Sequence, residues 1–137
     1  MTIVLDASVT LAWLYPDETT EAIRHVFDSV TEDGGIVPSL WRLEVANGLT
    51  LAARRGRITA SFRATSLADL ALAPISVDDE TDLHAWNVTL HLADQFGLTL
   101  YDAAYLELAK RRSLPLASLD GELRKAATNS GVPLLGI

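Results

Sequence analysis

The sequence predicts an α/β fold in which helices cover a mostly parallel sheet of short strands. Two observations indicate this class. Short apolar runs alternate with longer helical patterns along the whole chain, and repeated strand–helix alternation is typical of parallel sheets. The chain has 137 residues, of which 49% are hydrophobic and 21% are charged. This composition and length favour one globular domain with a substantial core.

The first third of the chain is expected to contain two strands and two helices. Ile3–Leu5 is a short apolar run and is predicted to be a strand, followed by a helix over Ser8–Leu14. A second helix is expected over Glu18–Asp33, because Gly34-Gly35 provides a stop signal. The apolar pair Ile36–Val37 is then predicted to be a short strand.

Two further helices are expected in the middle of the chain. Ser39, which follows a proline, is predicted to cap a helix that runs to Arg55 and stops at Gly56. Thr59 is predicted to cap a helix that reaches about Ala71.

The remainder continues the same alternation. The predicted strands are Pro74–Val77, Leu116–Ser118 and Pro133–Leu135. The predicted helices are one that Asp78 or Asp79 caps and that ends at Gly97, one from Thr99 to about Arg112, and one from Asp120 to near Gly131.

Four acidic residues lie in or beside apolar runs, where a carboxylate is unexpected: Asp6, Glu44, Asp102 and Asp120. An unpaired buried carboxylate is costly, so such residues are usually paired or bind a cation. Asp6 and Asp120 each follow a strand, so both should emerge at the edge of the sheet where α/β proteins place their sites. Four such acids, far apart in the sequence, suggest one metal site assembled by the fold.

Three of the acids also have a purely structural interpretation as helix caps. Asp6 and Asp120 are suited to cap the helices that follow them. The segment from Thr99 to Asp102 is similar to a capping box, with Asp in place of the usual Glu or Gln. These interpretations stay open beside the metal-site hypothesis.

Glu44 has no such role as a cap. By three- and four-residue spacing it is expected on an apolar stripe of its helix, with Leu40, Leu43, Asn47 and Leu51. The structural alternative is a salt bridge within the helix or to another part of the fold. Asp102 is likewise expected to share a face with core-like residues such as Tyr105, while Glu107 is expected to point away.

The net charge of −7 argues against nucleic-acid binding when taken alone, because phosphate affinity comes largely from Lys and Arg. Clustered acids can, however, attract divalent cations that then attract phosphate. Two basic runs, Arg54-Arg55-Gly56-Arg57 and Lys110-Arg111-Arg112, lie at predicted helix C-termini. They are interpreted either as complements to the helix dipole or as phosphate contacts. The acidic run Asp78-Asp79-Glu80 is interpreted as favouring the dipole of the helix that follows, rather than as a metal site.

Several classes of protein are excluded by composition. The chain has no cysteine, which excludes a disulfide scaffold, a thiolate metal site and a cysteine nucleophile. The N-terminus meets an acid at once, unlike a signal peptide, and no apolar run reaches membrane-spanning length. We therefore expect a soluble, cytoplasmic protein with no membrane partner.

Four ordered motifs resemble those of a known family. They are Leu5-Asp6-Ala7-Ser8 and the segments Pro38–Asn47, Leu98–Ala109 and Leu114–Asp120. In this order they resemble the PIN-domain ribonucleases, and most closely the small VapC-type toxins of type II toxin–antitoxin systems. The resemblance covers essentially the whole chain. It implies a single PIN domain over residues 1–137, with three α/β/α layers around a mostly parallel sheet of about five short strands.

The resemblance also assigns roles to residues. It implies that Asp6, Glu44, Asp102 and Asp120 are catalytic, with Asp6, Asp102 and Asp120 as the nearest metal ligands and Glu44 acting through a water molecule. Ser8, Asn47 and Ser118 match positions that support the ligands or contact substrate. The family often has a further Asp or Asn after the last Asp, and Glu122 is the nearest acid here. RNA-phosphate candidates are Arg54, Arg55, Arg57, Lys110, Arg111 and Arg112.

The function that the resemblance implies is a Mg²⁺- or Mn²⁺-dependent endoribonuclease that cleaves phosphodiester bonds with metal-activated water. The expected partners are an RNA substrate (tRNA, rRNA or mRNA), a cognate antitoxin protein and a second copy of the chain in a homodimer. One alternative is a non-catalytic, metal-stabilised α/β module that binds a partner protein. Another, an aspartyl-phosphate protein, is disfavoured because Ala7-Ser8 follows Asp6 where a phosphatase would have Asp-x-Asp.

Overall fold

Five parallel strands form the central sheet of the computed structural model, which describes residues 1–137. The strands are β1 (Ile3–Leu5), β2 (Gly35–Val37), β3 (Ile75–Val77), β4 (Leu116–Ala117) and β5 (Leu134–Leu135). Their spatial order is β3-β2-β1-β4-β5. All neighbouring strands are parallel, so the predicted sheet is confirmed.

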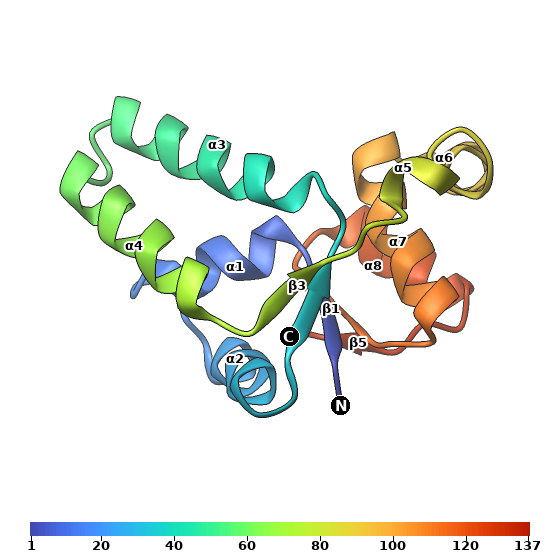
Figure 1. Cartoon of the computed structure of the whole chain (residues 1–137), viewed down its shortest axis with the longest axis horizontal. Coiled ribbons are helices and arrows are strands. Elements are labelled where there is room, and N and C mark those ends of the chain that lie inside the picture. Colours follow the sequence, from blue (N-terminus) through green and yellow to red (C-terminus); the bar gives the residue numbers. More distant parts are fainter.

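Eight helices cover the two faces of this sheet. They are α1 (Ala7–Leu14), α2 (Glu21–Asp33), α3 (Trp41–Arg54), α4 (Ala60–Leu72), α5 (Thr81–His84), α6 (Val88–Phe96), α7 (Leu100–Arg112) and α8 (Gly121–Asn129). Figure 1 shows α1–α4 on one side of the strands and α5–α8 on the other. The chain moves outward from β1 through β2 to β3 and then returns to β4, so right-handed crossovers put the two helix groups on opposite faces. The α/β/α class is confirmed.

The core includes β1, β4 and α7. Val4, Leu5, Leu116 and Ala117 are fully buried. Every residue of α7 from Ala103 to Ala109 is buried as well, because the helix packs on β1 and β4 and against α6 and α8. A helix held on so many sides gives a rigid base to the residues at its N-terminus.

Two helix starts differ from the prediction. The second helix begins at Glu21 instead of Glu18, because the Thr20 hydroxyl accepts the Ile23 N–H at 3.2 Å and caps it there. Ser39 does not cap α3. Its N–H instead donates to the Thr81 hydroxyl at 3.1 Å, and Leu40 occupies the cap position without a side-chain bond.

The single helix expected between Asp78 and Gly97 is wrong. The structure has two helices here, α5 and α6, and Asn87 between them has a non-helical backbone (φ −125°, ψ −100°). Asp78 does not cap either helix, because its carboxylate binds Arg111. The end at Gly97 is confirmed, since this residue is in the left-handed region at φ 65°. The caps predicted at Thr59, Thr99 and Asp120 are also confirmed.

No helix in the structure has both the length and the apolar character required to cross a membrane.

Candidate active site

The four acids predicted to form a site come from four elements that meet at the carboxyl edge of the sheet. Asp6 directly follows β1, and Asp120 lies three residues after the end of β4. Glu44 is in the first turn of α3, and Asp102 is in the first turn of α7. These elements belong to both helical layers, so the site lies between the layers (Figure 1).

Asp6 is buried and is held by three donors. The Ser8 hydroxyl donates to Oδ1 at 2.6 Å, and the Ser118 hydroxyl donates to Oδ2 at 2.5 Å. The Val9 N–H also donates to Oδ1, at 3.1 Å, so Asp6 caps α1 as well. Burial raises the pKa of Asp6, and these hydrogen bonds partly oppose the rise. Both carboxylate oxygens therefore have fixed positions.

The same two hydroxyls join the segments that follow β1 and β4. The Leu119 N–H donates to Ser8 Oγ at 2.9 Å, and the Asp120 N–H donates to Ser118 Oγ at 3.0 Å. The Asp120 carboxylate accepts the Leu123 N–H at 2.8 Å and so caps α8. Asp6 and Asp120 therefore both cap the helices that follow them, and both lie at the same edge of the sheet, as predicted.

Glu44 is half-buried and contacts a tyrosine from the opposite helical layer. The Tyr105 hydroxyl donates to Glu44 Oε1 at 2.6 Å. Burial raises the pKa of Glu44, the Tyr105 hydrogen bond lowers it, and the charge of Asp6 raises it further. Burial, and then Glu44 itself, raise the pKa of the Tyr105 phenol, which therefore keeps its proton and acts as the donor.

The apolar stripe on which Glu44 was predicted to lie is not buried in the core. The stripe that it shares with Leu43 and Leu51 is not the core face of α3, because Leu43 is 77% exposed and Leu51 is 38% exposed. The core face is formed by Trp41, Val45, Leu49 and Ala52. Glu44 lies at the border between the two faces.

The close packing of α3 on α1 fixes where Glu44 lies. A Cβ on Gly48 would be 2.6 Å from Leu11 Cδ1, so a larger residue at this position would require the Leu11 side chain to move. The Trp41 indole donates to the Thr10 hydroxyl at 3.1 Å, and that hydroxyl donates to the Asp6 carbonyl at 2.8 Å. Sequence reasoning did not single out Thr10 or Trp41, because only the folded chain brings them together.

The charges of the other three acids act on Asp102. Burial raises its pKa to about 6, and the charges of Asp120, Glu44 and Asp6, in that order, contribute to the rise. No Lys, Arg or His forms an ion pair with any of the four carboxylates. The chain thus gathers four acids without supplying a positive charge, and a bound cation would remove the repulsion between them.

The raised pKa values predict how pH affects the stability of the metal-free protein. Folded Asp102 retains its proton up to about pH 6, whereas the unfolded chain releases it near pH 4. Its stabilising contribution is therefore complete below about pH 4 and is lost as the pH rises to about 6. We expect the free energy of unfolding to decline over this range in denaturant titrations. An Asp102→Asn variant should show a weaker decline, and an unchanged decline would contradict the assignment.

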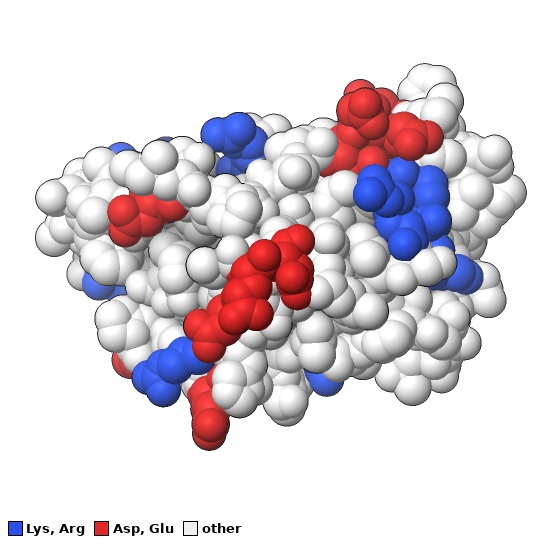
Figure 2. Space-filling model, turned by 60° about the horizontal axis from the view of Figure 1, so that its bottom comes forward, with Lys and Arg blue, Asp and Glu red and all other residues white.

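The remaining predicted residues differ in their exposure and in their contacts. Asn47 and Glu122 are exposed, and neither side chain forms a hydrogen bond within the chain. Of the basic residues, Arg57 pairs with Glu18 and Asp17. Of the six candidates for RNA phosphates, Arg54, Arg55, Lys110 and Arg112 form no ion pair. Figure 2, which brings forward the side of the molecule where β1 begins, shows acidic side chains in a row and only separate basic groups, so the face in this view has no continuous basic surface.

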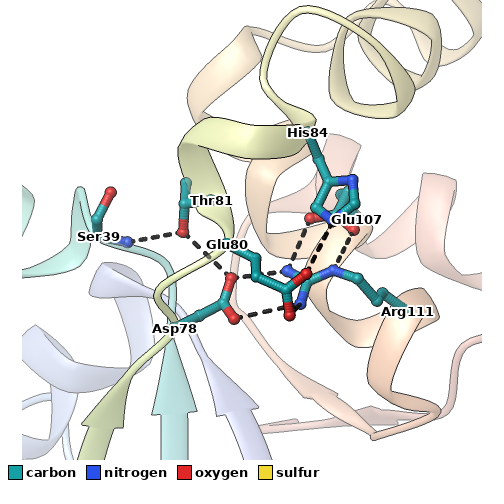
Figure 3. A network of polar contacts seen from close by, with 7 residues as sticks. All are labelled: Ser39, Asp78, Glu80, Thr81, His84, Glu107 and Arg111. Atoms are coloured by element: carbon teal, nitrogen blue, oxygen red, sulfur yellow. Dashed lines mark hydrogen bonds and ion pairs between the residues drawn. The ribbon is translucent and has the colours of Figure 1, made fainter.

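Arg111 is not free to contact substrate, because carboxylates surround it (Figure 3). It pairs with Asp78 at 2.6 Å, with Glu107 at 2.8 Å and with Glu80 at 3.5 Å. Glu107 is buried and points to Arg111, contrary to the expectation that it would be peripheral. The pairing was not visible in the sequence, because Asp78 and Arg111 are 33 residues apart.

The acids Asp78, Asp79 and Glu80 are the group whose carboxylate oxygens all lie within 4.8 Å of one another. Arg111 already neutralises part of their charge, since it binds both Asp78 and Glu80. Asp78 and Glu80 therefore belong to an ion-pair network with Arg111, whereas Asp79 forms no ion pair, and a role of the run at the helix dipole stays a prediction. The four acids of the sheet edge, which lack such a partner, form the better candidate for a cation site.

Comparison with known proteins identifies the family. The family model of the PIN domain matches residues 3–129. This chain belongs to the PIN-domain family. It is 30% identical over 123 residues to Ribonuclease VapC3 of Pyrobaculum aerophilum, with 90% of this chain and 92% of the relative covered. The resemblance to VapC-type PIN domains is thereby confirmed.

Solved structures of the same fold extend the comparison. The crystal structure of PAE2754 from Pyrobaculum aerophilum superposes with a TM-score of 0.70 at 25% identity, covering 98% of this chain and 83% of that one. VapBC2 from Rickettsia felis, solved with a DNA fragment from its promoter, gives a TM-score of 0.66 at 11% identity, with 98% and 97% covered. At that identity the second likeness shows the fold alone.

Proposed function

We propose that this PIN domain is a metal-dependent endoribonuclease, the toxin of a toxin–antitoxin pair. The observation that supports this best is the cluster of Asp6, Glu44, Asp102 and Asp120, four carboxylates for which the chain supplies no cation. The relative that covers nine-tenths of the chain is a ribonuclease by name. Site chemistry and family membership therefore favour the same activity.

The donor set fits Mg²⁺ or Mn²⁺. Hard divalent cations prefer carboxylate oxygens, and Mg²⁺ is usually bound by only one or two carboxylates together with waters. Asp6, Asp102 and Asp120 would hold the ion, and Glu44 would contact it through water. When bound, such an ion supplies an activated water and neutralises charge that develops on the phosphate.

The chain's own residues orient the ligands. Ser8 and Ser118 each donate to one oxygen of Asp6, which fixes the plane of the carboxylate. The N-terminus of α8 fixes Asp120. Outer hydrogen bonds of this kind hold metal ligands in place in many metalloenzymes. Exposed Asn47 would contact substrate, and Arg54, Arg55, Lys110 and Arg112 remain as candidates for the RNA phosphates.

Chelation is the decisive test of this function. Purified protein incubated with a panel of tRNA, rRNA and mRNA should cleave at least one RNA, should stop when EDTA is added, and should resume with excess Mg²⁺ or Mn²⁺. Asp6→Asn is the matched control, since it keeps the size of the side chain and removes its charge. If no RNA is cleaved although the protein binds Mn²⁺, the alternative of a metal-stabilised binding module is favoured. Cleavage that EDTA leaves unchanged would contradict the proposal.

We also propose that the chain forms a homodimer and binds an antitoxin protein. Exposed apolar residues on one helical layer support an interface there, namely Leu43 and Leu51 on α3 and Leu72 on α4. Apolar surface of this kind is typical of protein contacts. Beside it, an apolar hollow of about 290 Å³ lies between α3, α4 and β3.

A charge placed on this surface should separate the dimer. We expect Leu43→Lys to shift the mass measured by light scattering from dimer to monomer at micromolar concentration, because a lysine would be buried without a partner. Leu83→Lys, at an exposed leucine on the opposite helical layer, is the control and should leave the mass unchanged. A dimer that persists in Leu43→Lys would place the interface elsewhere.

A further inference from the structure

We propose that Tyr105 is a positioning residue for the reaction, which acts by holding the Glu44 carboxylate in place across the site. This inference rests on the proposed function, because it concerns the same acids. The contact is the hydrogen bond of 2.6 Å from the Tyr105 hydroxyl to Glu44 Oε1, between residues 61 positions apart in the sequence.

The Glu44 carboxylate has no other partner in the chain. No second side chain or backbone N–H donates to it, and no basic residue pairs with it. A glutamate side chain with three rotatable bonds has considerable conformational freedom when nothing restrains it. The single hydrogen bond from Tyr105 therefore selects its orientation.

The donor itself is rigid. Tyr105 is only 1% exposed, and it lies in the part of α7 where every residue is buried. Burial limits competition from water for the hydroxyl, and the packed ring cannot change rotamer without disturbing the core. Glu44, which is half-exposed on another helix, is thus fixed by a group that does not move.

The contact also relates two of the acids to each other. Asp102 lies one turn before Tyr105 on α7, and side chains three residues apart share a helix face. The hydrogen bond from Tyr105 therefore holds Glu44 of α3 at a set distance from Asp102 of α7. Since α3 and α7 belong to opposite helical layers, this contact defines the spacing of the site across the layers.

The test compares Tyr105→Phe with Tyr101→Phe. Both changes remove one hydroxyl from the same helix, but Tyr101 is 64% exposed and touches none of the site's hydrogen bonds. We expect Tyr105→Phe to weaken Mn²⁺ binding, measured by calorimetry without RNA, by about 10-fold. This is the lower end of the effect of losing an outer partner of a metal ligand, because Glu44 would contact the ion through water. The value of kcat for RNA cleavage should decrease by a similar factor. Tyr101→Phe should match the wild type in both.

A Glu44→Ala protein distinguishes a role of Tyr105 in holding Glu44 from a role in packing the core. In a Glu44→Ala protein there is no carboxylate to hold, so adding Tyr105→Phe should cause no further loss of Mn²⁺ affinity. Wild-type Mn²⁺ affinity and cleavage in Tyr105→Phe would overturn the proposal. The same loss in both backgrounds would also overturn it, since Tyr105 would then act through the core.

The calorimetric measurement needs no RNA. A wild-type protein that binds Mn²⁺ but cleaves no RNA would therefore refute the nuclease function, while the binding data would still decide the role of Tyr105.

Discussion

Asp102→Asn should reduce metal-dependent RNA cleavage by about a thousandfold or more. The loss of one metal-binding carboxylate removes several kcal/mol of stabilisation from the transition state, and about 4 kcal/mol corresponds to a factor of 10³. Asp102 is the residue to change, because the charges of Asp120, Glu44 and Asp6 all raise its pKa. Single-turnover cleavage of a defined RNA at saturating Mn²⁺ measures the effect.

The same substitution should make the metal-free protein more stable. The pKa of Asp102 is raised to about 6, which means that its charge is unfavourable in the folded state at pH 7. Because the side chain is only partly buried, solvent screening reduces the benefit, and we expect a gain of about 1 kcal/mol in the free energy of unfolding. Active sites often retain charges that cost stability.

Asp94→Asn is the matched control for both measurements, since Asp94 is an exposed acid of α6 outside the site. It should change neither cleavage nor stability. An Asp102→Asn protein that cleaves RNA at the wild-type rate, or that unfolds more easily than the wild type at pH 7, would contradict the role assigned to Asp102.

The position of Asp6 and Asp120 could be predicted from the sequence because it depends on local rules. Each follows a short apolar strand, and the carboxyl ends of parallel strands meet at one edge of the sheet. The positions of Glu44 and Asp102, which lie on helices, do not follow from such local rules. Glu44 and Asp102 reach the site only because α3 packs on α1 and α7 packs on the sheet, and such packing is a tertiary property. For these two, the family resemblance predicted a role in the site that periodicity could not predict.

Periodicity was also misleading for Glu44 and for α5 and α6. Leu43 and Leu51 suggested a buried stripe, yet both are exposed, so the spacing of leucines along a helix does not by itself identify its core face. The segment from Asp78 to Gly97 looked like one helix with an acidic start. Two of its acids, Asp78 and Glu80, instead bind Arg111 of a distant helix, and the local sequence contains no information about that pairing.

Tyr105 could have been noticed in advance. It follows Asp102 by three residues and so shares its helix face, and a buried tyrosine hydroxyl usually finds a hydrogen-bond partner. Which acid would accept from it depends on how α3 and α7 are arranged in space. The sequence could therefore suggest a polar role for Tyr105, but not the contact with Glu44.

Arg111→Ala should destabilise the protein by about 3–5 kcal/mol, the usual cost of removing one partner from a buried ion pair. The side chains of Asp78 and Glu107 are only 3% and 4% exposed, so both would be left as uncompensated buried charges. Burial tends to raise the pKa of Asp78, but the hydrogen bond and charge of Arg111 outweigh it and hold the pKa below its usual value. Without Arg111, only burial and the weaker hydrogen bonds would act on the pKa of Asp78, and burial would disfavour the charged carboxylate.

Thermal and denaturant unfolding measure this effect, and Arg112→Ala is the control. Arg112 is the next residue of α7 but is exposed and forms no ion pair, so its removal should cost less than about 0.5 kcal/mol. Arg111→Lys should fall between the two, because lysine keeps the charge but not the planar set of donors that reaches Asp78 and Glu107 together. Equal stability of the two alanine variants would show that the network contributes nothing.

The network's effect should be confined to stability, because Arg111 lies at the end of α7 opposite to Asp102. At a temperature where Arg111→Ala remains folded, Mn²⁺ affinity should equal that of the wild type. A combined replacement of Arg111, Asp78 and Glu107 by apolar residues should recover much of the lost stability, since no charge would then be buried without a partner. Recovery of stability without a change in Mn²⁺ affinity would establish that the ion-pair network supports the fold, while the four acids at the sheet edge are free to bind the metal.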